Sequence, residues 1–151
     1  MQLDRRLRDA LYLVLGVLFV TGVAWYLLDM MRDPFAAAPA YNAGPLLLAV
    51  HGAAAMIFLL LLGALLPLHM RSNWASDRNR WTGIVMLGAN GVLIVTAYAL
   101  YYSGSDSVRG WASDVHLAAG LFLPAWVAVH VWLGRRARLA SQRRAPDTAG
   151  K

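Results

Sequence analysis

Four histidines inside apolar stretches are the residues of this sequence best suited to chemistry. His116 and His130 lie fourteen residues apart in one apolar stretch, and His51 and His69 lie eighteen residues apart in another. In a helix, fourteen residues return the second imidazole to within roughly 40° of the first, about 21 Å further along the axis. Eighteen residues make about five full turns, or roughly 27 Å. Each pair of histidines therefore shares one face of its helix.

Ionisable side chains inside a membrane are unfavourable and usually mark a functional site. Imidazole nitrogens are good ligands for haem iron and for other transition metals. The sequence has no cysteine, which excludes disulfides, thiolate-bound iron–sulfur clusters and covalently attached c-type haem. We therefore expect two haems, each held between the second and fourth apolar stretches. Their depths pair His51 with His116 near the outer face, and His69 with His130 near the cytoplasmic face.

Four apolar stretches must position these histidines. Hydrophobic residues make up 59% of the 151 residues, and each stretch has about the length that a bilayer core requires. The first apolar run is longer than the core of a cleaved signal sequence. We expect an all-α integral membrane protein with one membrane domain over residues 1–151, folded as an up-down four-transmembrane-helix bundle. The expected spans are 11–30, 45–68, 81–102 and 111–133.

The basic residues predict the orientation in the membrane. Thirteen arginines and one lysine stand against eight aspartates and no glutamate, and the net charge is +6. Twelve of the basic residues fall on one side of the expected spans, and only Arg32 and Arg109 fall on the other. This distribution predicts a multi-pass protein with cytoplasmic termini and a basic cytoplasmic tail over 135–151. The localisation that we expect is a bacterial inner (cytoplasmic) membrane. The distribution indicates that the basic residues interact with the lipid bilayer and not with nucleic acid.

An internal repeat relates the first and third apolar stretches. Residues 16–26 read GVLFVTGVAWY and residues 91–101 read GVLIVTAYALY, with seven of eleven positions identical. Chance similarity between apolar segments is the alternative to duplication. If the repeat is a duplication, the second and fourth stretches are also equivalent, and their histidines are equivalent ligands.

Other residues are candidates for the surroundings of a cofactor. Small residues let backbones approach a porphyrin closely, although they also serve ordinary helix contacts in membranes. Arginines near the membrane faces can pair with haem propionates, or can remain simple surface charges. These candidates are Gly22, Gly83, Gly88, Arg80 and Arg109.

The four-span layout and the histidine positions resemble the di-haem cytochrome b superfamily. That superfamily includes the membrane subunits of formate dehydrogenases and nickel–iron hydrogenases, together with small bacterial cytochromes b. The resemblance covers residues 10–135 and implies haem b, exchange of electrons with quinone, and a redox protein subunit on one membrane face. His51, His116 and His130 match ligand positions of that pattern. Formate dehydrogenase-type members place one inner ligand on the first helix, which has no histidine here, so either His69 substitutes or only one haem is present.

Two other functions remain open at this stage. The histidines can line a metal or proton pathway, or bind copper or zinc directly. The chain can also be a structural accessory subunit of a larger membrane complex. No flavin or nucleotide motif is present, so we expect a non-catalytic electron-transfer subunit or a component of a quinone-linked oxidoreductase.

Overall fold

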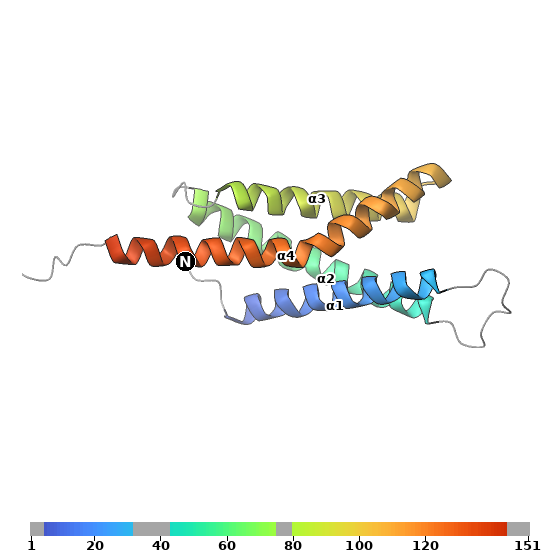
Figure 1. Cartoon of the computed structure of the whole chain (residues 1–151), viewed down its shortest axis with the longest axis horizontal. Coiled ribbons are helices and arrows are strands. Elements are labelled where there is room, and N and C mark those ends of the chain that lie inside the picture. The colour runs from blue at the N-terminus through green and yellow to red at the C-terminus, as the bar shows by residue number, and fades with distance from the viewer. Residues whose placement is uncertain (1–4, 32–42, 75–79, 145–151) are drawn as a thin grey trace, which may run out of the picture. The chain divides into compact units, whose positions relative to one another are not determined.

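The computed structural model describes residues 5–31, 43–74 and 80–144, without the side chains of 68–74, 80, 138 and 141–144. The described residues form four helices: α1 (Arg5–Met30), α2 (Gly44–Trp74), α3 (Arg80–Tyr102) and α4 (Asp106–Arg144). The helices are shown in Figure 1. The chain divides into two compact units, Met1–Ser72 and Asn73–Lys151. The all-helical membrane class is confirmed, and the closed bundle of all four helices stays a prediction.

Each helix contains a segment that is long and apolar enough to cross a membrane. The four segments are Arg5–Met30, Gly44–Pro67, Trp81–Tyr102 and Asp106–Ala137. They agree with the stretches expected from the sequence, apart from a few residues at their ends. The multi-pass membrane character of the chain therefore follows from the lengths and compositions of its helices.

In the first unit, α1 and α2 run in opposite directions (Figure 1). The second helix begins with Gly44 and Pro45, and proline fits the first turn because its missing N–H would have no helical partner there. The backbone N–H of Leu47 donates to the carbonyl of Ala43 at 2.9 Å, which closes the first turn. Pro67 lies inside this helix, close to the end of its apolar segment.

In the second unit, α3 and α4 pack along one another in opposite directions (Figure 1). The connection between them is short and serine-rich. Ser105 precedes the first residue of α4, and its carbonyl accepts from the N–H of Arg109 at 3.0 Å. Asp106 lies in the first turn of α4, where its negative charge interacts favourably with the positive end of the helix dipole.

The pattern of burial is inverted relative to a soluble protein. Among the described residues, the buried polar side chains are three threonines and Asn90, whereas Leu60 and Phe122 are 75% and 74% exposed. Lipid can solvate leucine and phenylalanine but offers hydroxyl and amide groups no hydrogen-bond partner. The polar groups are therefore on the protected faces, and the apolar groups face outward.

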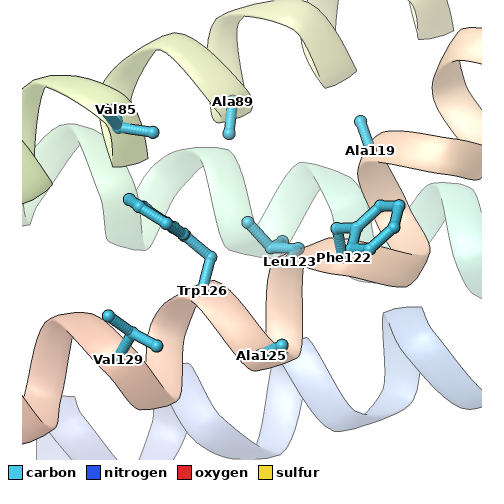
Figure 2. A pocket seen from close by; sticks show the side chains of 8 residues that line it. All are labelled: Val85, Ala89, Ala119, Phe122, Leu123, Ala125, Trp126 and Val129. Atoms are coloured by element: carbon cyan, nitrogen blue, oxygen red, sulfur yellow. The ribbon is translucent and has the colours of Figure 1, made fainter.

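The fourth helix extends beyond its expected membrane span. The expected span ends at Leu133, and the helix continues into the basic tail as far as Arg144. Arginine, alanine, leucine and glutamine in this continuation are good helix formers, so the chain has no reason to unwind where the apolar run ends. Pro124 lies inside the helix. The α4 ribbon changes direction between Ala119 and Ala125 in Figure 2, as expected where a proline removes a backbone hydrogen bond.

Ala112 is the most deeply buried residue described, with no exposed surface. We predict that Ala112→Leu destabilises the protein by about 1–3 kcal/mol, because a packed interior has no room for the extra carbon atoms. Ala118→Leu is the matched control, since Ala118 lies on the same helix but is exposed. Denaturation of both variants in the same detergent measures the difference. Equal stabilities would contradict the close packing at Ala112.

Candidate functional site

Three of the four histidines are hydrogen-bonded to threonines on the neighbouring helix of their own unit. Thr21 Oγ1 on α1 lies 3.0 Å from His51 Nδ1 on α2. On α3, Thr96 Oγ1 lies 2.9 Å from His116 Nδ1, and Thr82 Oγ1 lies 2.9 Å from His130 Nδ1. The Thr96–His116 and Thr82–His130 pairs therefore both join α3 to α4. The histidines thus present the same ring nitrogen to the same type of side chain at three separate positions.

The direction of two of these hydrogen bonds follows from the threonines themselves. The hydroxyl of Thr21 donates to the carbonyl of Val17 at 2.7 Å, and that of Thr96 donates to the carbonyl of Val92 at 2.7 Å. A hydroxyl has only one proton, so each Oγ1 must accept from the imidazole N–H. The proton of a neutral ring is then on Nδ1 and its lone pair is on Nε2. In this tautomer, Nε2 is the ring nitrogen whose lone pair could bind a metal ion.

The two pairs of the second unit share one helix register. Fourteen residues separate Thr82 from Thr96, and fourteen separate His116 from His130. Because α3 and α4 are antiparallel, equal spacing on both helices lets both pairs form at once. Leu93 also approaches this interface, with Cδ2 lying 4.0 Å from the Cβ position at Gly120.

The internal repeat of the sequence contains the threonines of the Thr21–His51 and Thr96–His116 pairs. Thr21 and Thr96 are equivalent positions of the two repeated segments, and each hydroxyl bonds both the helix carbonyl four residues earlier and a histidine. Gly22 lies beside the first pair. A Cβ at Gly22 would lie 3.3 Å from His51 Cε1 and 3.6 Å from His51 Nδ1. The glycine therefore gives the imidazole the room that it needs against α1.

An apolar cavity of about 300 Å³ lies between α3 and α4, along the part of the unit between its two threonine–histidine pairs (Figure 2). Val85 and Ala89 line it from α3, and Trp126 extends from α4 toward α3. The indole N–H of Trp126 is buried and has no hydrogen-bond acceptor among the described residues. Buried donors nearly always have a partner, so this side chain indicates a place where a bound group can bring an acceptor. The cavity is also lined by Ala119, Phe122, Leu123, Ala125 and Val129.

The remaining predicted residues are placed as follows. At Gly83 and Gly88 an added Cβ would meet nothing within 4 Å, and Arg109 is exposed at the start of α4. His69 lies on α2 and Arg80 begins α3, but their side chains lie outside the described part of the structure. The cofactor roles predicted for these residues stay predictions. Within the described residues, no three His, Cys, Asp or Glu side chains gather as a metal site would require.

The threonines are the functional residues that sequence reasoning missed. Thr21, Thr82 and Thr96 are the only threonines in the membrane-spanning segments. Two signals pointed to them: the shared VT within the repeat, and the fourteen-residue spacing of Thr82 and Thr96, which equals that of the two histidines on the last helix. Both signals became readable only when two helices were compared with each other.

We predict that Gly22→Ala disturbs the His51 ring, because the added Cβ would lie closer to Cε1 than ordinary contacts allow. Gly16→Ala is the control, since nothing lies within 4 Å of a Cβ there. The control variant should gain up to about 1 kcal/mol from helix propensity, and Gly22→Ala should gain less or lose stability. Denaturation in detergent and the ¹⁵N resonances of the His51 ring measure the two effects. Identical behaviour of both variants would rule out a tight Gly22–His51 contact.

The geometry described above is the basis for a functional assignment, because the comparisons with known proteins found no match. No protein-family model matches the chain, and no curated protein or solved structure matches it either. The resemblance to the di-haem cytochrome b superfamily is therefore still a prediction from the histidine positions and the four spans.

Proposed function

We propose that this chain is a transmembrane electron carrier that holds haem b between histidines of its apolar helices. In this proposal it exchanges electrons between a redox protein subunit on one membrane face and the quinone pool. The observation that carries the proposal is the recurrence of one arrangement at equivalent positions of the two units: Thr21 with His51, and Thr96 with His116. In both, the threonine places the imidazole proton on Nδ1 and leaves Nε2 as the ligating atom.

The residues present fit a haem in three respects. Neutral imidazole nitrogens are the axial ligands that haem iron takes from histidine, and a second hydrogen bond on the other ring nitrogen normally holds such ligands in place. Gly22 leaves space beside one of these rings. The cavity by Trp126 is apolar and contains a buried N–H donor without an acceptor among the described residues.

Two axial ligands per iron require the histidines to act in pairs. We propose that His51 and His116, each bonded to the threonine of a repeated segment, share one iron, and that His69 and His130 share a second. A single haem held by the outer pair is the alternative, because the side chain of His69 lies outside the described residues. The two proposals differ in the number of haems per polypeptide.

When bound, haem supplies a one-electron couple between ferric and ferrous iron. Two imidazoles per iron leave no open coordination position, so the site is suited to passing electrons and not to binding oxygen or a substrate. The chain supplies the rest of the environment. Apolar side chains of the spans exclude water, and the threonine hydroxyls hold the imidazoles without introducing a charge into the membrane.

The orientation that we propose has both termini in the cytoplasm of a bacterium, with the protein in its inner membrane. The basic residues after the last span support it. The guanidinium of Arg136 lies 3.7 Å from the centre of the Trp132 ring, which is an arrangement that anchors a helix end at a membrane surface. At the opposite end of the second unit, the rings of Tyr98 and Tyr102 lie in contact, with centroids 4.7 Å apart and planes tilted by 34°. Tyrosines are enriched at membrane interfaces, so this pair fits the other membrane face.

We predict that the purified protein shows a sharp α-band on reduction with dithionite, and that His51→Ala and His116→Ala each remove the same haem. Loss of either imidazole leaves that iron with one axial ligand, while the apolar helices remain long enough to insert. The haem-to-protein ratio measures the loss. Met56→Ala is the control: Met56 lies on the same helix as His51 and is 70% exposed, so its loss should leave the ratio unchanged.

The same ratio tests the pairing. If one histidine variant lacks haem and the other retains it fully, the two histidines do not share an iron. A wild-type protein without haem would overturn the proposed function. His69→Ala separates the two haem counts: a fall from two to one supports the inner haem, and a constant ratio of one dismisses it.

The absence of cysteine allows a direct test of orientation, because each introduced cysteine is the only thiol. Ser105 and Ala140 are both exposed and lie beyond opposite ends of the α4 apolar segment. We predict that a membrane-impermeant maleimide labels Ser105→Cys in intact spheroplasts, and labels Ala140→Cys only after permeabilisation. The reverse order of labelling would place the termini outside.

A further inference from the structure

The threonine hydroxyls at the outer pairs lie at the centre of a two-bond chain. Thr21 and Thr96 are only 8% and 2% exposed, and each hydroxyl donates to a carbonyl of its own helix while accepting from a histidine. A buried hydroxyl in an apolar surrounding keeps such bonds, because no water competes for them. The threonine hydroxyl, which donates to its own helix, is therefore an acceptor that favours the imidazole proton on Nδ1.

We infer that Thr21 and Thr96 are positioning residues that act through His51 and His116, selecting the Nδ1–H tautomer and lowering the reduction potential of the iron that these rings bind. This inference rests on the proposed haem function. It adds a way in which that function is regulated, because the threonine hydroxyl tunes the reduction potential of the iron. Neither threonine contacts the iron in this arrangement.

The physical reason lies in the charge distribution of the ring. Donation from Nδ1–H to an acceptor moves electron density toward Nε2 and makes that nitrogen a more basic ligand. A more basic ligand stabilises ferric iron more than ferrous iron, so the potential falls. Removal of the hydroxyl takes away one acceptor of the Nδ1–H and so weakens the preference of the ring for this tautomer.

A purely structural role for the threonines makes a different prediction. In that case the hydroxyls only join neighbouring helices, and their removal would lower stability without changing the iron. The readouts that separate the two roles are the tautomer of the unloaded ring and the potential of the loaded site. A purely structural role would change neither the tautomer nor the reduction potential.

The test replaces each threonine by valine, which keeps the branched shape and removes the hydroxyl, and by serine, which keeps the hydroxyl. The first measurement uses the apoprotein with ¹⁵N-labelled histidine. We expect protonated Nδ1 in wild type and in Thr21→Ser and Thr96→Ser, and a mixture of tautomers in Thr21→Val and Thr96→Val. A predominantly Nε2-protonated ring in the wild type would overturn the inference, and so would valine variants with unchanged resonances.

The second measurement uses the haem-loaded protein. Loss of an outer hydrogen bond to a metal-binding histidine typically weakens metal binding about 10–100-fold, and we expect haem loss to a scavenging apoprotein to accelerate in that range in the valine variants. Their midpoint potential should rise, and the serine variants should stay near wild type. Valine variants that keep both the wild-type rate of haem loss and the wild-type potential would overturn the inference.

The two measurements keep the inference separate from the proposed function. If the wild-type protein takes up no haem, the proposed function fails, while the apoprotein spectra still report whether the threonines set the tautomer. If haem is present but the valine variants behave as wild type in both measurements, the inference fails and the proposed function stands.

Discussion

The structure depends on one constraint: a polar side chain in the interior of a membrane must find its hydrogen bonds within the protein. The Thr21–His51 and Thr96–His116 pairs satisfy this constraint for the threonine hydroxyls and for Nδ1 of the two rings. Thr96 bonds the carbonyl of Val92 and the imidazole of His116, so a strongly polar ring enters the membrane without an unpaired donor on that side. The same bonds align neighbouring helices, and Thr82 with His130 does so at the other end of the second unit.

The features that could be predicted from the sequence are those that depend on one helix at a time. Apolar length predicted the four spans, and the fourteen-residue spacing placed His116 and His130 on one face; both are now seen to contact α3. The threonines could not be found in this way, because a hydroxyl in an apolar run means little until the facing helix and its register are known. The continuation of α4 to Arg144 lies beyond the predicted span, because a membrane limits the length of the apolar run and not the length of the helix.

The two units are similar at one position and different at the other. Thr21 and Thr96 correspond through the repeat, and each bonds a histidine of the next helix. In the second unit Thr82 lies fourteen residues before Thr96 and His130 lies fourteen after His116, whereas the same intervals from Thr21 and His51 lead to Leu7 and Leu65. His69 lies four residues beyond Leu65, which is about one helical turn. If the chain arose by duplication, both halves kept the histidine that pairs with Thr21 or Thr96, and only the second half has a histidine at the position of His130.

The equal spacing on α3 and α4 restricts how this part of the chain can evolve. One residue inserted between His116 and His130 would rotate the later histidine by about 100° and move it by about 1.5 Å, away from its threonine. A compensating insertion between Thr82 and Thr96 would restore that pair only if both helices turned by the same amount. Point substitutions can therefore accumulate in the intervening residues, whereas changes of length are tolerated only in the connections between helices. Homologues of this unit should be recognisable by two conserved intervals, even where little of the apolar sequence between them is retained.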